Sequence, residues 1–219
     1  MKIQSSIREM LDLKGFDRMI AIIDYDAGNL KSVEKALLHL GQECKITRNP
    51  EEIFAADKVI LPGVGAFGDA MQKLEKYGLV DVIKKTVEKK TPFLGICLGL
   101  QLMFESSDET PGVEGLGLLP GKIVAMPPKE GYKIPHMGWN SIEINQNSRL
   151  FKGIPNQSYV YFVHSFYLQA ENESDVAATT EYTTHIHCAV EHENIFACQF
   201  HPEKSGDVGL QILKNFCED

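Results

Sequence analysis

Short apolar runs alternate with amphipathic segments through the first two thirds of the chain. The apolar runs at 19–24, 59–61 and 93–96 have the length of strands, whereas 30–40 and parts of 68–89 carry apolar residues at helical spacing. Such alternation implies right-handed βαβ crossovers. We therefore predict an α/β fold with a mostly parallel central sheet flanked by helices.

The pattern changes after about residue 120, where β-rich runs follow one another with few helical segments between them. The predicted strands are 121–125, 141–144, 159–163, 177–180, 186–190 and 195–199. They predict an added antiparallel β region in the same sheet or beside it. The Pro- and Gly-rich segment 126–138 is expected to be a loop placed for contact, and 207–216 a closing helix.

Composition narrows the class of protein. The chain has 219 residues, of which 43% are hydrophobic, and a net charge of −8 without a basic cluster, so no nucleic-acid partner is expected. Its apolar runs are far shorter than the roughly 20 residues that span a bilayer, so no membrane partner is expected. Residues 1–18 resemble no secretory signal, so we expect a cytoplasmic protein. We interpret these residues as an N-terminal extension, non-native or disordered. A single domain is predicted at 19–219.

The strongest chemical signal surrounds Cys97. An apolar strand runs into Gly-Ile-Cys-Leu-Gly at 95–99 and then into a helical pattern, which is typical of a nucleophile elbow with cysteine in place of serine. Small residues allow the sharp turn, and the following helix points its positive end at the thiolate. The alternative is a buried cysteine in a Gly-flanked turn. The other cysteines form no C-x-x-C pair, so they indicate neither a zinc finger nor a disulfide framework.

A second signal is His201-Pro-Glu203, which ends a strand-like run. Proline fixes the turn, so the carboxylate of Glu203 can reach one imidazole nitrogen while the other faces the sulfur of Cys97. This is the arrangement of nucleophile, base and orienting acid found in a catalytic triad. A lone histidine at a strand end is more often structural, and the cysteine elbow makes the catalytic interpretation the better one.

A third signal is the turn Pro62-Gly-Val-Gly65 after the second predicted strand. Its backbone N–H groups can point at an anion that develops beside the nucleophile. Its structural alternative is a loop that needs positive φ. The histidines at 185, 187 and 192 lie near no suitable carboxylate and cysteine set, so we interpret them as solvent-facing and predict no metal site.

Together these motifs resemble the triad (class I) glutamine amidotransferase family. Further blocks narrow the resemblance to the glutaminase subunits of imidazole glycerol phosphate synthases: 23–30, 62–71, Pro-His-Met-Gly-Trp-Asn at 135–140, 161–166 and 199–205. The resemblance runs from Met19 to the C-terminus. It implies the flavodoxin-like fold of that family, no cofactor, and hydrolysis of L-glutamine to glutamate and ammonia.

The resemblance also implies roles for individual residues. Cys97 would attack the glutamine carboxamide, His201 would act as general base, and Glu203 would orient it. Oxyanion and glutamine-binding groups would come from Gly63, Val64, Gly65, Leu98, Gln101, Ser165 and Phe166.

The resemblance implies a (β/α)₈-barrel synthase subunit. Such a barrel typically needs about 250 residues, which this chain does not have, so the barrel is expected to be a separate partner. In that heterodimer ammonia passes to the barrel, which makes imidazole glycerol phosphate and an aminoimidazole carboxamide ribonucleotide in histidine biosynthesis. The implied interface residues are Asn29, Pro135, Met137, Trp139 and Lys204.

Two alternatives remain open on sequence alone. A sibling amidotransferase could feed a different synthase, for example one that makes a nitrogen-containing surface sugar, with the same triad. A non-catalytic module with Cys97 as an oxidation sensor would not need His201 and Glu203. One residue departs from the family pattern, because Asp26 stands near the implied partner face where glycine is expected.

Overall fold

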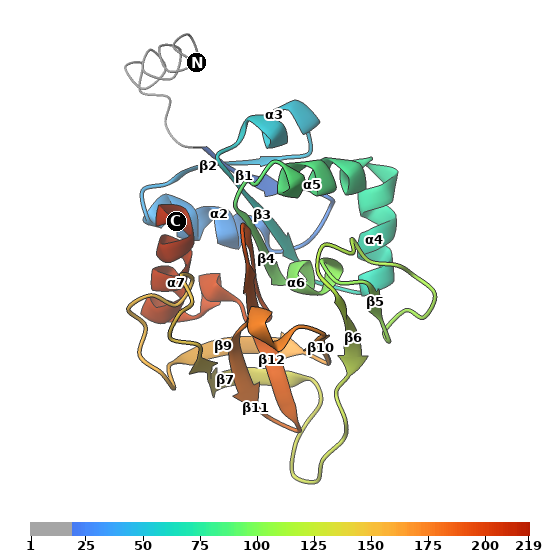
Figure 1. Cartoon of the computed structure of the whole chain (residues 1–219), viewed down its shortest axis with the longest axis vertical. Coiled ribbons are helices and arrows are strands. Elements are labelled where there is room, and N and C mark those ends of the chain that lie inside the picture. The colour runs from blue at the N-terminus through green and yellow to red at the C-terminus, as the bar shows by residue number, and fades with distance from the viewer. Residues whose placement is uncertain (1–18) are drawn as a thin grey trace.

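The computed structural model describes residues 19–219, and our interpretation of residues 1–18 lies outside the described residues. A large mixed sheet forms the centre of the molecule, with its neighbouring strands in the order β2-β1-β3-β4-β13-β12-β10-β6-β5. Helices cover the upper part of this sheet in Figure 1, and β-strands make up most of the lower part.

The first half of the sheet is parallel. It contains β2 (Glu43–Thr47), β1 (Met19–Ile23), β3 (Lys58–Gly63), β4 (Phe93–Cys97) and β13 (Ile195–Cys198). The parallel pairing of β13 with β4 joins two strands that are about a hundred residues apart in the sequence. It therefore brings the segments that follow Cys97 and Cys198 to the same edge of the sheet, where ligands of open α/β sheets bind.

Helices cover both faces of this parallel half. One face packs against α2 (Leu30–His39) and α7 (Gly206–Glu218), and the other packs against α3 (Pro50–Ala55), α4 (Phe67–Lys76) and α5 (Leu79–Glu88). The predicted α/β architecture is confirmed. None of the helices in the described range is long and apolar enough to cross a membrane.

The prediction missed β2 and α3, which lie between the first two predicted strands. β2 is an edge strand in which Glu43 and Lys45 are exposed, so its sequence lacks a continuous apolar run. α3 has six residues and buries the Ile53 side chain against the sheet. Elements this short leave little periodic signal.

The other half of the sheet is antiparallel in most of its pairings. Its strands are β12 (His185–His192), β10 (Phe166–Ala170), β6 (Gly121–Ala125), β5 (Ser106–Ser107), β11 (Val176–Glu181) and β8 (Glu143–Ile144). The predicted antiparallel region is thus confirmed as part of the central sheet. The strand β10 was not predicted.

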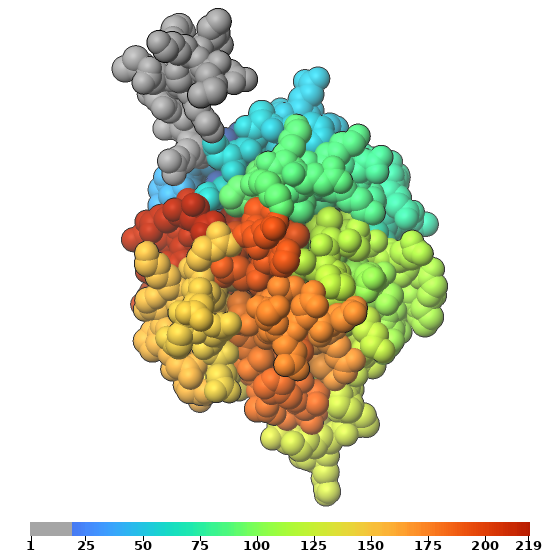
Figure 2. All heavy atoms as spheres, in the orientation of Figure 1, coloured from blue at the N-terminus to red at the C-terminus, as the bar shows by residue number. Residues whose placement is uncertain are grey.

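A separate two-stranded sheet pairs β7 (His136–Ser141) with β9 (Tyr159–His164). The prediction of a loop at 126–138 is wrong at its C-terminal end, because a strand begins at His136. The predicted strand at 141–144 is likewise divided, since Ile142 separates β7 from β8. The remainder of the loop projects from the body of the protein, as the yellow-green tip in Figure 2 shows.

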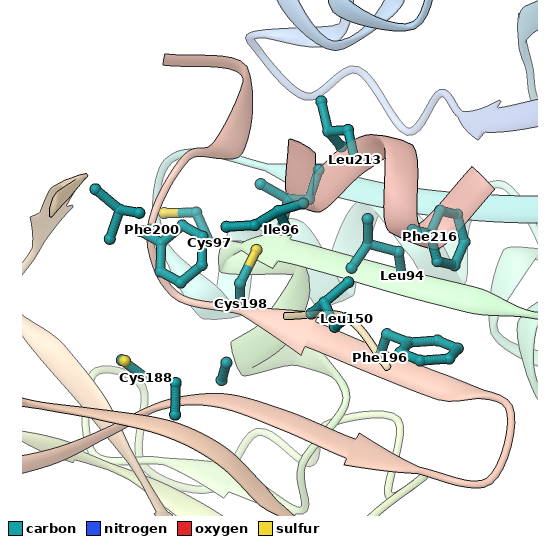
Figure 3. Packing of buried hydrophobic residues seen from close by; sticks show 14 of the residues in the cluster. Leu94, Ile96, Cys97, Leu150, Cys188, Phe196, Cys198, Phe200, Leu213 and Phe216 are labelled. Carbon is teal, nitrogen blue, oxygen red and sulfur yellow. The ribbon is translucent and has the colours of Figure 1, made fainter. Parts of the chain in front are cut away.

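Two apolar clusters lie on opposite faces of the parallel strands. In β1 the side chains of Ile20 and Ile22 enter the cluster under α2 and α7, whereas Ala21 and Ile23 enter the other cluster. This alternation is the period-two pattern of a strand buried on both faces. Figure 3 shows Cys97 beside Phe200 and Ile96 in the cluster under α2 and α7, so the candidate nucleophile is surrounded by closely packed side chains.

Candidate active site

Cys97 lies at the sharp turn between β4 and α6 (Leu98–Leu102), as the sequence predicted. Its backbone has φ 54° and ψ −109°, a conformation that residues with a side chain rarely adopt. The turn depends on Gly99, because a β-carbon there would lie 1.8 Å from the carbonyl oxygen of Leu61. Close packing of α6 on β3 thus holds the thiol at the end of the strand. The helix is shorter than the predicted pattern and ends at Leu102.

His201 and Glu203 form a buried pair directly after β13. The Nδ1 atom of His201 lies 2.7 Å from Oε1 of Glu203, and neither side chain is exposed. Pro202 begins the short 3-10 turn that brings the carboxylate back to the imidazole. The predicted contact is therefore confirmed, and the opposite nitrogen of the ring is left to face the sulfur.

Cys97 and Glu203 favour the protonated form of His201. Burial alone would lower the pKa of His201, but Cys97 and Glu203 raise it, and the net result is a pKa of about 9. Among the described residues, Nε2 of His201 has no hydrogen-bond partner. An imidazolium with a free N–H beside the sulfur of Cys97 can donate a proton to the leaving group of a substrate that this sulfur attacks.

Asn29 also belongs to this site, although the resemblance implied only an interface role for it. Its Nδ2 atom donates a hydrogen bond of 2.6 Å to Oε1 of Glu203. Asn29 precedes α2 and has φ 73°, yet its side chain does not cap that helix. The side-chain amide of Asn29 binds the carboxylate of Glu203 instead.

The glycine-rich turn lies beside Cys97, as predicted. β3 and β4 run parallel, with Gly63 opposite Cys97, so the turn after β3 borders the thiol. Gly65 has φ 107°, which accounts for glycine at that position. The hydroxyl group of the buried Tyr25 packs behind Gly63 and has no hydrogen-bond partner in the described part of the chain.

A cavity of about 370 Å³ opens at Cys97 and His201. Its lining contains most of the residues that the sequence assigned to the oxyanion and glutamine-binding groups: Val64, Gly65, Leu98, Gln101, Ser165 and Phe166. Gly63 is not among the lining residues. Glu109 and His164 also line the cavity, although neither was predicted as a site residue. No periodic or motif signal marks Glu109, whereas His164 lies within a block that carried the family resemblance.

The implied interface residues differ in exposure. Met137 is 61% exposed and Trp139 is 55% exposed, both on β7, and Lys204 is exposed as well. Pro135 lines the cavity. Two exposed apolar side chains therefore lie on a strand that begins next to the cavity.

The histidines outside the site have partners of their own. His185 contacts Glu181, Nδ1 of His192 lies 2.9 Å from Asp175, and Nδ1 of His187 accepts a hydrogen bond from a backbone N–H. His185 and His192 are exposed as predicted, whereas His187 is half-buried. Across residues 19–219 no group of three or more His, Cys, Asp or Glu side chains could hold a metal ion.

Asp26 adopts φ 62°, the left-handed conformation that favours the glycine expected there. Its carboxylate is held by Arg48 at 2.6 Å and by the hydroxyl group of Tyr77. Lys73 donates to its carbonyl oxygen at 3.1 Å. These contacts explain how an aspartate is accommodated at a glycine position.

The fold is that of a glutamine amidotransferase, and the comparison with protein families agrees. Residues 21–219 match the family model described as glutamine amidotransferase class-I. The chain belongs to this family.

Within the family, the curated relatives are more specific. The imidazole glycerol phosphate synthase subunit HisH of Caldanaerobacter subterraneus subsp. tengcongensis is 52% identical over 200 residues, which covers 91% of this chain and 98% of that protein. The subunit of the same name from Methanocaldococcus jannaschii is 49% identical, with 91% and 99% covered.

Solved structures support the fold. A glutamine amidotransferase crystal structure superposes with a TM-score of 0.70 at 20% identity and covers 90% of this chain and 98% of that one. The PurLQS structure from Thermotoga maritima gives a TM-score of 0.70 at 18% identity, with 93% and 99% covered.

Proposed function

We propose that this chain is the glutaminase subunit of an imidazole glycerol phosphate synthase and that Cys97, His201 and Glu203 carry out its reaction. The observation that carries the proposal is the convergence of Cys97 and the His201–Glu203 pair on one cavity. The near 50% identity to HisH subunits over almost their full length supports the pathway.

The reaction begins when the Cys97 thiolate attacks the side-chain carboxamide carbon of glutamine, forming an S–C bond and an oxyanion. The C–N bond then breaks, and the His201 imidazolium donates its proton to the leaving ammonia. Water attacks the glutamyl thioester while His201 accepts its proton, and the C–S bond breaks to release glutamate. Glu203 keeps the imidazole in one orientation throughout.

The oxyanion is stabilised by backbone N–H groups. The first N–H of a helix lacks an intrahelical acceptor, so Leu98 at the start of α6 offers one donor. The Gly63–Val64 peptide offers the second when its N–H points into the cavity. Removing one such donor typically costs about 10²–10³ in rate, so the orientation of this peptide controls the reaction.

Glutamine's α-amino and carboxylate groups bind to other residues of the cavity lining. These are Gln101 and the backbone at Ser165 and Phe166, and Glu109 adds a carboxylate for the α-ammonium group. The backbone N–H of Phe67 donates to Glu109 at 2.7 Å, which keeps this carboxylate beside the cavity.

The partner is a (β/α)₈-barrel synthase subunit that receives ammonia at the β7 face. Exposed apolar side chains concentrate there: Tyr132, Ile134, Met137 and Trp139. Such a patch marks a protein-interaction surface. Its continuity with the cavity at Pro135 gives ammonia a short path that avoids bulk water.

All five cysteines are unpaired thiols, which supports a cytoplasmic location.

The test measures steady-state glutamine hydrolysis by the chain alone, with the barrel subunit, and with the barrel and its nucleotide ligand. We expect the rate to rise in that order, because the partner stabilises the active orientation of the Gly63–Val64 peptide. Cys97→Ser should abolish glutamine-dependent synthesis but leave synthesis from ammonium salts intact. Substantial turnover by Cys97→Ser would contradict the nucleophile, and equal rates in all three mixtures would contradict the coupling.

A further inference from the structure

Gln199 is a fully buried glutamine that has no role in the mechanism above. It lies two residues before His201, and its Nε2 atom is 3.7 Å from the sulfur of Cys97. Its Oε1 atom accepts a hydrogen bond of 3.0 Å from Nε2 of Gln101. A buried amide in contact with the candidate nucleophile is in a position to change its reactivity.

The orientation of the Gln199 amide follows from its neighbours. Nε2 of Gln101 donates a hydrogen bond of 3.2 Å to the carbonyl oxygen of Phe166, which can only accept. The same Gln101 nitrogen faces Gln199, so Gln199 must present its oxygen to Gln101. Its N–H group is thereby turned toward the sulfur of Cys97. The reversed amide would place two donors against each other.

The Phe166 carbonyl is itself fixed from the other side. Nδ1 of His164 lies 2.9 Å from this oxygen and must donate to it. The Nε2 atom of His164 then accepts from Nδ1 of His136, 3.0 Å away on β7. Burial lowers the pKa of His164 to about 3 and that of His136 to about 4, so both rings are neutral and their tautomers are set. Both lone pairs of the Phe166 carbonyl are thus occupied within the protein.

We propose that Gln199 is a further catalytic residue, whose side-chain N–H donates a hydrogen bond to the Cys97 thiolate. Gln101 and the Phe166 carbonyl are the positioning groups that hold this donor. The inference rests on Cys97 being the nucleophile in the proposed function. A donor that is already oriented stabilises the anion without reorganisation, whereas the thiol gains less from it.

The experiment measures alkylation of Cys97 by iodoacetamide at neutral pH in the full chain, read by mass spectrometry of the Cys97 peptide. It requires neither glutamine nor a partner, so its result is independent of the pathway assignment. We expect Gln199→Leu to slow alkylation about tenfold or more, which is typical of losing a hydrogen bond to a charged group. Gln199→Glu should slow it further, because a carboxylate cannot donate and adds negative charge.

The experiment has two controls, a second cysteine in the same protein and a variant with the same change of charge. The half-buried Cys44 should be alkylated at the wild-type rate, and Gln211→Glu on the exposed face of α7 should leave Cys97 unaffected despite the same change of charge. A wild-type alkylation rate of Cys97 in Gln199→Leu would overturn the proposal. A loss of glutamine turnover without slower alkylation would also overturn it, since Gln199 would then act on the substrate alone.

A second measurement needs no Gln199 variant and therefore does not depend on its folding. In the full chain labelled with ¹⁵N-glutamine, the side-chain N–H signal of Gln199 should shift when Cys97 is changed to Ser or alkylated. The Gln211 signal should remain in place. Absence of a Gln199 shift would overturn the proposal.

Discussion

The side-chain amide of Asn29 donates to the carboxylate of Glu203 at 2.6 Å, although 174 residues separate them. The same nitrogen lies 3.5 Å from Nδ1 of His201. Asn29 therefore holds the carboxylate that orients the imidazole. It stands at the start of α2, immediately after the loop in which Tyr25 packs behind Gly63, so one short segment contacts both the acid and the oxyanion turn.

We expect Asn29→Gly to lower the kcat for glutamine about tenfold, because the buried carboxylate loses a charged hydrogen bond. Glycine tolerates the φ of 73°, so the backbone should not be strained. The matched control is Asn49→Ala. Asn49 caps α3 by accepting from the N–H of Glu51, so this variant should lose about 1 kcal/mol of stability with kcat unchanged. An unchanged kcat in Asn29→Gly would show that this hydrogen bond is catalytically irrelevant.

Glu203→Gln should reduce glutamine turnover less than His201→Ala. In Glu203→Gln the new side-chain amide oxygen can still accept a hydrogen bond from Nδ1 of His201 and keep the ring in place. In His201→Ala the imidazole that transfers the proton is lost. The comparison requires kcat for both purified variants in the complex, with circular dichroism to show that each is folded. The opposite ranking would mean that the assigned roles are wrong.

Gly63→Ala should destabilise the chain by about 1–3 kcal/mol, the usual cost of overpacking, and suppress glutamine turnover. A β-carbon on Gly63 would lie 2.3 Å from the Tyr25 hydroxyl oxygen and 3.0 Å from Cβ of Leu98. Removing that hydroxyl should relieve part of the clash. In urea unfolding, the double variant Gly63→Ala/Tyr25→Phe should therefore be more stable than the two single changes predict by addition. Strict additivity would rule out this contact as the cause.

The buried histidines should give stability a pH dependence. Burial lowers the pKa of His164 to about 3 and that of His136 to about 4, against an unfolded value near 6.5. As pH falls from 6.5 to 5, the unfolded chain binds protons that the folded chain does not. The free energy of unfolding should then decrease, by up to about 1.4 kcal/mol per pH unit for each histidine.

His201 should act in the opposite direction. Burial opposes its protonation, but Cys97 and Glu203 raise the pKa of His201 to about 9, so the folded chain retains a proton that the unfolded chain releases above pH 6.5. Stability should therefore also fall between pH 6.5 and 9. Urea unfolding across this range is the measurement. His164→Asn should flatten the acid limb and His201→Gln the alkaline limb; limbs unaffected by these changes would contradict the assignment.

Trp139→Ala should weaken binding of the barrel subunit roughly 30-fold, as expected for a large exposed aromatic side chain at an interface centre. The control is Leu38→Ala on α2, because this apolar side chain has a similar exposure but belongs to another element. Titration calorimetry with the purified barrel gives both affinities. Equal affinities for wild type and Trp139→Ala would place the interface elsewhere.

Local patterns were sufficient for much of the fold. The strands that carry Gly63 and Cys97 are continuous apolar runs, and the steric demands of a strand-turn-helix junction are met by small residues within four positions. The contact between His201 and Glu203 is likewise local, since Pro202 limits the turn between them. Such features depend on backbone sterics over a few residues, and these are written in the sequence itself.

Elements with little local signal were missed. The edge strand β2 alternates charged and apolar residues, and β7 begins inside a segment whose prolines and glycines indicate a loop. What makes 136–141 a strand is its register with β9, in which His136 lies opposite His164. That pairing forms only when the two segments meet in the folded chain.

The sequence alone determined the nucleophile elbow, the histidine and its carboxylate, because each arises from neighbouring residues. Only the tertiary structure decided that Asn29 serves Glu203 and that Gln199 turns its N–H toward Cys97. Asparagine and glutamine each carry a donor and an acceptor, so their sequence position does not select a partner. The hydrogen-bond partner of each side chain depends on which polar atoms lie near it once burial has excluded water. Non-local packing brings those atoms together.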